Sequence, residues 1–256
     1  MKFESIAQRH AYILDRLDKE ENVRVTELCD VLEVSPVTIR KDLKILEDKR
    51  LLYKSHGSIS RSNPYTKDTH VNEKEQLQLS QKIRIGQNAA QQIEPGEAII
   101  IASGTTVLQL AKSINTNDRL TVLTSAMNVA MALLTSPDVE VVQMGGIVRK
   151  TSSSVTGYFA ESMLSHFACS KLFLGVDGID MVHGCTTSNM MEAKLNKTMI
   201  ESVQKAIVLT DSTKFGKRGF GKICSIEEID QVITDDGIPD NYAKWLENNG
   251  VTLTVV

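Results

Sequence analysis

The chain of 256 residues is long enough for one large domain, or for a small domain followed by a medium-sized one. Its composition, 41% hydrophobic and 24% charged, is ordinary for a globular protein, and its net charge of −3 argues against a protein that coats nucleic acid with basic surface but permits a local basic patch. Four scattered cysteines without a C-x-x-C pair predict neither a zinc site nor a disulfide framework, and the lack of a long apolar run or a signal-peptide core leads us to expect a cytoplasmic protein.

The N-terminal part of the chain has the pattern of a helix-turn-helix. Apolar side chains recur at helical spacing over residues 6–17, and a second helix is expected after Thr26, which can serve as its N-cap. Ser35 and Pro36 then provide the N-cap and the first position of a third helix, predicted to run to about residue 48. This helix has an apolar face and a basic face, and two short helices followed by such a third one are typical of a helix-turn-helix.

A β-hairpin is predicted after the third helix. Residues 51–54 have the pattern of a strand, residues 55–58 that of a turn, and Ile59 begins the return strand, so the hairpin would form a wing. From Thr38 to Arg61, seven basic residues outnumber three acidic ones, which suits a surface that contacts phosphates. We therefore predict a DNA-binding domain over residues 1–59, and the alternative is a three-helix dimerisation or protein-binding module. The candidate DNA-contacting residues are Ser35, Val37, Thr38, Arg40, Lys41, Lys44, Lys54 and His56.

The rest of the chain has the pattern of an α/β domain. Residues 60–71 show no period and are predicted to be a linker, and residues 72–256 a second domain that begins with a long helix over residues 72–93. Short apolar strands then alternate with helical stretches, which predicts right-handed βαβ units and a Rossmann-like, mostly parallel sheet. The expected strands are residues 98–102, 120–123, 139–144, 172–176, 206–209, 231–234 and 251–256, and the expected helices are residues 128–134, 160–166, 192–203 and 241–248.

Polar clusters follow the predicted strands, and the first of them suits an anion. The strand at residues 98–102 leads into Ser103, Gly104, Thr105 and Thr106, just before a helix. Backbone N–H groups, hydroxyls and the helix dipole at such a turn can bind a phosphate ester, although many strand-to-helix turns are plain connections. Ligands of parallel sheets bind outside the carboxyl ends of the strands, so we predict a ligand site at this edge. Later clusters at the same edge add Ser125, Gly145 and Gly146.

Ordered motifs in both halves of the chain resemble the DeoR family of bacterial transcriptional regulators. Residues 34–43 and 54–58 are similar to its winged helix-turn-helix, with Lys41 and Ser58 as mild departures from the usual pattern. The resemblance implies that the third helix lies in the major groove and that Asp42 has a structural role. The blocks similar to the family's sensor domain are residues 102–106, 145–146, 175–180, 184–187 and 211–216, in the same order.

The resemblance implies a repressor of a carbohydrate operon with a sensor domain related to ribose-5-phosphate isomerases. In such a domain Gly104, Thr105 and Thr106 would hold the phosphate of a phosphorylated sugar, and Asp177 and Glu192 would face its hydroxyls or stabilise the rim. The other effector residues that it implies are Lys74, Lys82, Asp211 and Lys214. Each has an alternative as a solvated lysine or as a carboxylate that caps a turn or a helix. Where the family commonly has T-N-S, this chain has Thr124-Ser125-Ala126, so the recognised sugar can differ.

Two other functions remain open from the sequence. One is an active sugar-phosphate isomerase fused to a DNA-binding module, with Asp177, Asp180, Glu192 and Lys194 available for proton transfer. The other is a scaffold that binds DNA without a small ligand. We favour a regulator and expect no catalytic residue, no metal ion and no cofactor besides the phosphorylated sugar. We also expect at least a homodimer, because operator half-sites pair with protein symmetry. The sequence names neither the sugar nor the operator.

Overall fold

The computed structural model describes residues 5–20, 22–49, 51–55, 58–60 and 68–256. The chain divides into two compact units, Met1–Lys67 and Asp68–Val256, and each is described by itself. The predicted linker at residues 60–71 spans this division. Ser60 belongs to a strand of the first unit, residues 61–67 lie outside the described residues, and Asp68 begins the second unit.

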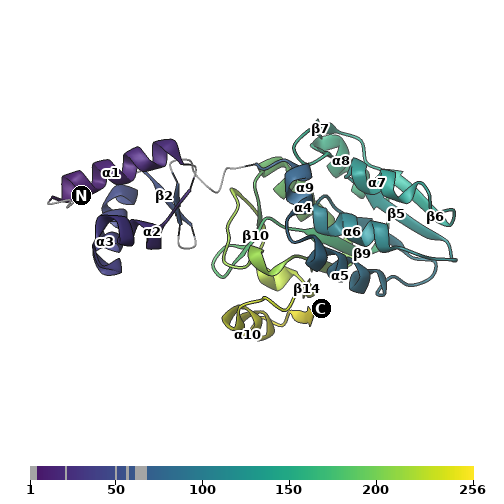
Figure 1. Ribbon diagram of the computed structural model, residues 1–256. Helices are drawn as coiled ribbons and strands as arrows, with labels where there is room; N and C mark the ends of the chain where they lie inside the picture. Colours follow the sequence, from purple (N-terminus) through teal and green to yellow (C-terminus); the bar gives the residue numbers. More distant parts are fainter. Residues whose placement is uncertain (1–4, 21, 50, 56–57, 61–67) are drawn as a thin grey trace. The chain divides into compact units, whose positions relative to one another are not determined.

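The first unit has three α-helices and a small antiparallel sheet (Figure 1). Strand β3 pairs with both β1 and β2, so the short stretch at Val23–Arg24 completes the wing. Ser35 caps α3 as predicted, because its hydroxyl accepts the N–H of Thr38 at 3.2 Å and Pro36 occupies the first turn. Helix α2 begins before Thr26, with Arg24 as its N-cap. The elements are α1 (Ile6–Lys19), β1 (Val23–Arg24), α2 (Val25–Leu32), α3 (Pro36–Asp48), β2 (Tyr53–Ser55) and β3 (Ser58–Ser60).

Asp42 connects the first and third helices of this unit. Its carboxylate is buried in the face that α3 turns inward and accepts hydrogen bonds from Arg9 Nε at 2.8 Å and Arg9 Nη2 at 3.2 Å. The Nε2 atom of the His10 ring lies 3.2 Å from Asp42 Oδ1. A buried carboxylate is tolerated only when it is paired in this way. The structural role expected of Asp42 is therefore confirmed.

The second unit is built on a seven-stranded parallel sheet, which confirms the predicted fold class. The strand order is β15-β14-β12-β9-β4-β5-β6, and every neighbouring pair runs parallel. All seven expected strands are present. They are β4 (Ala98–Ile101), β5 (Leu120–Thr124), β6 (Val139–Gln143), β9 (Cys169–Gly175), β12 (Val203–Leu209), β14 (Gln231–Thr234) and β15 (Thr252–Val255).

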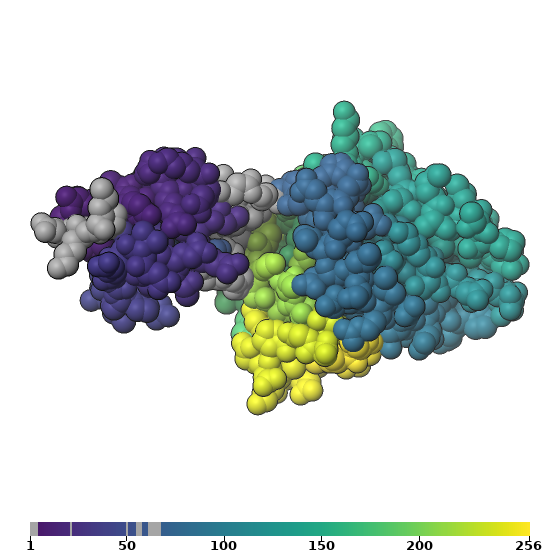
Figure 2. All heavy atoms as spheres, in the orientation of Figure 1, coloured from purple at the N-terminus to yellow at the C-terminus, as the bar shows by residue number. Residues whose placement is uncertain are grey.

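Helices cover both faces of this sheet, and alternate residues of the strands serve two separate cores. Ile99 and Ile101 of β4 pack with α5, α6 and α7, whereas Ile100 of the same strand packs with α8, α9 and α10. Figure 2 shows the unit from the side on which α5 and α6 cover the sheet. The helices are α5 (Leu79–Ala90), α6 (Thr105–Ser113), α7 (Met127–Leu133), α8 (Tyr158–Leu164), α9 (Met190–Glu201) and α10 (Asp240–Asn248).

A glycine allows α5 and α6 to pack closely. A Cβ atom added at Gly86 would lie 2.6 Å from the backbone carbon of Gln109, a distance that real side chains do not adopt. The backbones of the two helices can therefore approach only because this position lacks a side chain. This contact fixes α6, and with it the loop at its N-terminus.

The predicted long helix over residues 72–93 is wrong in one respect. The chain forms α4 (Val71–Gln76) and then α5, and Gln78 between them adopts a left-handed conformation with φ of 54°. The break turns α4 toward the carboxyl edge of the sheet, where Lys74 reaches Asp177.

Several short strands form two further small sheets and were not predicted. The β7–β8 hairpin consists of Ile147–Arg149 and Ser154–Thr156, and a three-stranded sheet contains β10 (Gly178–Asp180), β11 (Gly184–Thr187) and β13 (Gly221–Cys224). Two 3₁₀ turns, at Ser212–Lys214 and Ile226–Glu228, complete the unit. The hairpin and the first of these turns carry residues of the candidate site.

Candidate functional site

The solvent face of α3 carries an unpaired basic stripe. Val37, Arg40, Lys41 and Lys44 recur at i, i+3, i+4 and i+7, so they lie along one side of the helix, and all four are exposed. No acidic partner of Arg40, Lys41 or Lys44 lies within ion-pair distance among the described residues. The side chain of Val37 is 59% exposed, so its methyl groups are available to contact a thymine methyl group. Within the described ranges, the three basic side chains have no ion pair that a contact with DNA would have to break.

The other predicted DNA-contacting residues have mixed surroundings. Ser35 and Thr38 are bound to each other, with 3.0 Å between their hydroxyl oxygens, so they fix the start of α3. Lys54 on β2 forms an ion pair with Glu47 at 2.9 Å. His56 lies outside the described residues.

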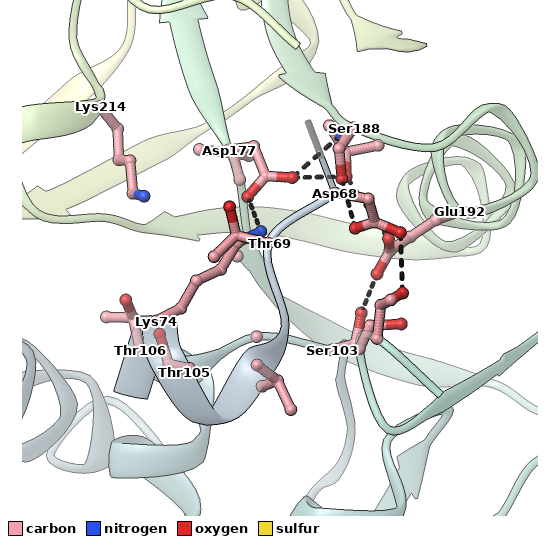
Figure 3. A pocket seen from close by; sticks show the side chains of 17 residues that line it. Asp68, Thr69, Lys74, Ser103, Thr105, Thr106, Asp177, Ser188, Glu192 and Lys214 are labelled. Carbon is pink, nitrogen blue, oxygen red and sulfur yellow. Dashed lines mark hydrogen bonds and ion pairs between the residues drawn. The ribbon is translucent and has the colours of Figure 1, made fainter. Parts of the chain in front are cut away.

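The second unit has a cavity at the carboxyl edge of its sheet, where the predicted ligand site lies (Figure 3). The volume of this cavity, counted as the space that the centres of water molecules can occupy, is about 60 Å³. Since one water needs roughly 10–15 Å³ on this measure, a ligand larger than a few waters must extend through the open side or displace side chains. The lining residues are Asp68, Thr69, Val71, Lys74, Ser103, Gly104, Thr105, Thr106, Thr151, Ser152, Gly175, Val176, Asp177, Thr187, Ser188, Glu192 and Lys214.

One wall of the cavity is the turn from β4 into α6. Gly104 has φ of 140°, a backbone conformation that favours glycine, and it directly precedes the first residue of the helix. The first intrahelical bond runs from the N–H of Leu108 to the carbonyl of Gly104, so the N–H groups of Thr105, Thr106 and Val107 have no acceptor among the described residues. These donors and the helix dipole favour an anion at this wall.

The opposite wall contains an ionised aspartate held by a lysine. Lys74 Nζ lies 2.7 Å from Asp177 Oδ1, while the N–H of Ser188 at 3.0 Å and the hydroxyl of Thr187 at 3.1 Å donate to Oδ2. Burial alone would raise the pKa of Asp177, but Lys74, the charge of Lys214 and the N–H of Ser188 lower it to about 2. Asp177 is therefore a carboxylate at neutral pH and accepts hydrogen bonds only.

Lys214 is the cation of the cavity that lacks an acidic partner. It ends the 3₁₀ turn after β12 and extends toward Asp177 without an ion pair in the described part of the chain (Figure 3). The carboxylate of Asp177 is already bound to Lys74. The ammonium group of Lys214 is consequently available to an anionic ligand.

Glu192 and Arg149 form a second polar group in the cavity wall. Glu192 lies in the first turn of α9 and accepts the hydroxyl of Ser103, and its other oxygen pairs with Arg149 of β7. Arg149 Nη2 also lies 2.5 Å from Asp68 Oδ2. The sequence analysis predicted Ser103 and Glu192 as site residues. It indicated no role for Arg149 or Asp68.

The structure brings eight of the predicted effector residues together in the cavity lining: Lys74, Ser103, Gly104, Thr105, Thr106, Asp177, Glu192 and Lys214. Five others do not line it. Ser125 is buried at the end of β5, where its carbonyl accepts the N–H of Val155 at 2.8 Å, and Gly145 and Gly146 lie between β6 and β7.

Asp211 and Lys82 lie behind the cavity wall. Asp211 caps the 3₁₀ turn that carries Lys214, since its carboxylate accepts the N–H of Thr213 at 3.1 Å. Lys82 is buried and donates to the carbonyl of Lys74 at 2.6 Å. Burial, together with the charges of Lys214 and Lys74, lowers the pKa of Lys82 to about 8 against the opposing effect of Asp211 and Glu75. These two residues position the lysines of the lining.

Several lining residues were missed because their contacts depend on tertiary structure. Asp68 and Thr69 fell within the predicted linker, and Thr151 and Ser152 lie in the unpredicted β7–β8 hairpin. Thr187 belongs to a block that resembled the family's sensor domain, and this resemblance could have identified it.

Neither a metal cluster nor a membrane span is found in the part of the chain that the structure describes. No group of three or more His, Cys, Asp or Glu residues there could hold a metal ion. None of the described helices is long and apolar enough to cross a membrane.

Comparisons with known proteins agree with this division of the chain. The model of the DeoR-like helix-turn-helix domain matches residues 9–64, and that of the DeoR C terminal sensor domain matches residues 77–236. A protein of Escherichia coli O157:H7, whose name links it to transcriptional repression of the aga operon, is 36% identical over 98% of this chain and 94% of its own length. The transcriptional regulator GolR of Listeria innocua is 30% identical over 97% of this chain and 98% of its own.

Further relatives are also named as regulators. The transcriptional repressor GlcR of Bacillus subtilis (strain 168) is 29% identical over 97% of this chain and 95% of its own. Among solved structures, ribose 5-phosphate isomerase A of Methanocaldococcus jannaschii is 13% identical, with a TM-score of 0.40 over 56% of this chain and 55% of its own. The relatives named here by sequence are regulators, which favours that reading over an isomerase.

Proposed function

The chain belongs to the DeoR family of DNA-binding transcriptional regulators, and from this premise we propose that it represses an operon for carbohydrate use in response to a phosphorylated sugar. The first unit would bind operator DNA through α3, and the cavity of the second unit would bind the sugar. Two of the relatives carry repression in their names, which supports the direction of the effect.

The observation that carries the proposal is the meeting of an unpaired lysine with unpaired N–H groups at one cavity. Among the described residues, Lys214 has no ion-pair partner and the N–H groups that begin α6 have no acceptor, so both favour an anion. A phosphate ester supplies the negative charge and the acceptor oxygens that these groups need. Asp177 and the hydroxyls of Thr187 and Ser188 would then bind hydroxyl groups of the sugar.

The effector can act on DNA binding only through a difference in its affinity for two states of the protein. Suppose that the sugar phosphate binds more tightly to the state with low DNA affinity. It then lowers the affinity of the protein for DNA by the same factor by which bound DNA lowers the affinity of the protein for the sugar phosphate. We propose in addition that the protein acts as at least a dimer, because paired half-sites require two copies of α3. Sedimentation of the full-length protein measures this directly.

A thermal-shift screen of the full-length protein tests the effector class. The panel contains pentose 5-phosphates, hexose 6-phosphates, the same sugars without phosphate, and inorganic phosphate. We expect one or more phosphorylated sugars to raise the melting temperature while their unphosphorylated counterparts do not, since a ligand at 100 times its Kd stabilises by about 2.7 kcal/mol. Equal stabilisation by the free sugar, or none by any phosphorylated sugar, contradicts the proposal.

DNA binding is measured with the fragment upstream of the protein's own gene. The sugar phosphate found in the screen should weaken binding to that fragment, and its unphosphorylated form should not. Turnover of the sugar phosphate by the purified protein would instead favour an isomerase.

A further inference from the structure

The cavity shares a wall with the stretch through which the chain enters the second unit. Asp68 is the first residue of that unit, and Asp68, Thr69, Val71 and Lys74 all line the cavity. We call residues 68–76 the strap. A ligand in the cavity would therefore touch the part of the chain that continues directly from the DNA-binding unit.

Four contacts hold the beginning of the strap to the β7–β8 hairpin and to the start of α9. Asp68 accepts hydrogen bonds from the hydroxyls of Thr151 at 2.7 Å and Ser188 at 3.0 Å, and it pairs with Arg149 at 2.5 Å. The N–H of Val71 donates to the carbonyl of Thr151 at 2.7 Å. These donors lower the pKa of Asp68 against the effect of burial, so the carboxylate is charged at neutral pH.

Arg149 connects this attachment to the anion-binding wall. Its guanidinium, only 10% exposed, bridges Asp68 and Glu192, and Glu192 in turn accepts the hydroxyl of Ser103. Two carboxylates thus share one cation. The chain of contacts runs from Ser103, beside the N-terminus of α6, through Glu192 and Arg149 to Asp68, the first residue of the strap. Figure 3 labels Ser103, Glu192 and Asp68 of this chain.

An anion at the N-terminus of α6 would compete with Glu192 for the two groups that donate to Glu192, the hydroxyl of Ser103 and the guanidinium of Arg149. The hydroxyl of Ser103 has one hydrogen to donate and gives it to Glu192. A phosphate beside Ser103 would repel the Glu192 carboxylate and attract the guanidinium of Arg149, whose flat, five-donor group binds phosphate well. An anion that takes over N–H donors of Arg149 would leave fewer of them for Asp68.

We propose that the Asp68–Arg149 ion pair is a latch, which an anion bound beside Ser103 opens, and that its opening releases the strap. The inference rests on the proposed function, because it takes the phosphate of the effector as the anion. The latch makes Asp68 a positioning residue for the response to the ligand, whereas Arg149 both holds the latch and can bind the anion.

Amide hydrogen exchange of the full-length protein tests the latch, with inorganic phosphate as the probe. We expect saturating phosphate to raise the exchange rate of amides in residues 68–76 about tenfold or more, the N–H of Val71 included. Asp68→Asn should exchange at the fast rate without phosphate and gain little when phosphate is added. Its melting temperature should still rise with phosphate, because the anion-binding groups are unchanged.

Two further variants sharpen the result. Glu75→Gln removes a different ion pair of the strap, the one between Glu75 and Lys112 at 2.9 Å outside the cavity lining, and should respond to phosphate as the wild type does. Arg149→Lys keeps the charge but cannot bridge two carboxylates with a planar fork, so it should resemble Asp68→Asn.

The outcomes separate the latch from the proposed function. If phosphate raises the melting temperature but leaves exchange of the strap unchanged or slower, the latch is wrong and phosphate binding stands. If Asp68→Asn keeps the wild-type response, the latch is also wrong. If phosphate stabilises neither the wild type nor any variant, the proposed anion site and the latch are both wrong.

Discussion

Lys74 and Asp177 are separated by 103 residues in the sequence, yet their side chains form an ion pair of 2.7 Å in the cavity wall. Lys74 comes from α4, and Asp177 follows β9 at the carboxyl edge of the sheet. The pair satisfies the carboxylate and leaves Lys214, whose charge also lowers the pKa of Asp177, as the cation available to a ligand. The two cavity lysines therefore have different roles.

We expect Lys214→Ala to weaken binding of phosphorylated ligands at least tenfold, because a charge-assisted hydrogen bond contributes about 1.5–3 kcal/mol. DNA binding without ligand should be unchanged. Calorimetric titration with the sugar phosphate from the thermal-shift screen measures the loss. Lys222→Ala is the matched control, since Lys222 is an exposed lysine that bonds Ser225 outside the cavity lining. Unchanged ligand affinity in Lys214→Ala would contradict the role of Lys214.

The sequence predicted the main sheet because each of its strands is a local apolar run. Strand β4, for example, is apolar on both faces and must be buried on both, which identifies a parallel sheet regardless of tertiary detail. The break between α4 and α5 was not predictable in this way, because Gln78 gives no local indication of its left-handed conformation.

The candidate site was predicted from two different signals. Ser103 was found because it follows a strand whose carboxyl end lies at the ligand-binding edge of the sheet, whereas Lys74, Asp177, Glu192 and Lys214 were implied by the resemblance to the DeoR family. Asp68 and Arg149 were missed. Asp68 fell within the predicted linker and Arg149 lies in a hairpin that was not predicted, so nothing local indicated an ion pair between residues so far apart in the sequence.

Arg40→Ala should weaken DNA binding by about 1–3 kcal/mol if its guanidinium contacts a base, or should reduce the slope of affinity against salt by about one if it contacts a phosphate. Arg40 is exposed on α3 with no ion-pair partner among the described residues, so the loss is one of DNA contact rather than of folding. Anisotropy titrations at several salt concentrations distinguish the two results. Arg119→Ala, which changes an 81% exposed side chain of the second unit, should leave both quantities unchanged. If Arg40→Ala keeps the wild-type DNA affinity and the wild-type slope of affinity against salt, the placement of α3 in the DNA interface is wrong.

Asp42→Asn should destabilise the first unit by about 3 kcal/mol, because it leaves the guanidinium of Arg9 without its charged partner in a largely buried position. Urea unfolding followed by circular dichroism measures the change. The control is Asp15→Asn, which removes one exposed ion pair with Lys19 on α1 and should change stability by less than about 1 kcal/mol. Equal effects of the two substitutions would mean that Asp42 does not hold α1 against α3.

The buried Lys82 predicts a stability that rises with pH. Its pKa is about 8 in the folded protein and 10.5 when unperturbed, so between these values the folded state has released a proton that the unfolded state keeps. The unfolding free energy should then rise with pH by up to about 1.4 kcal/mol per unit, whereas below pH 8 both states are protonated and the burial of charge is fully unfavourable.

Lys82→Met isolates this effect, because it removes the charge while keeping an apolar side chain of similar length. The variant also loses the hydrogen bond to the carbonyl of Lys74, which adds an offset. We therefore compare slopes: the unfolding free energy of the wild type minus that of the variant, from urea titrations at pH 7, 8, 9 and 10, should rise above pH 8. The same difference for Lys222→Met, at an exposed lysine, should stay flat. A flat difference for Lys82→Met would mean that Lys82 keeps its proton when folded, because the charges of Asp211 and Glu75 then offset burial and the neighbouring lysines.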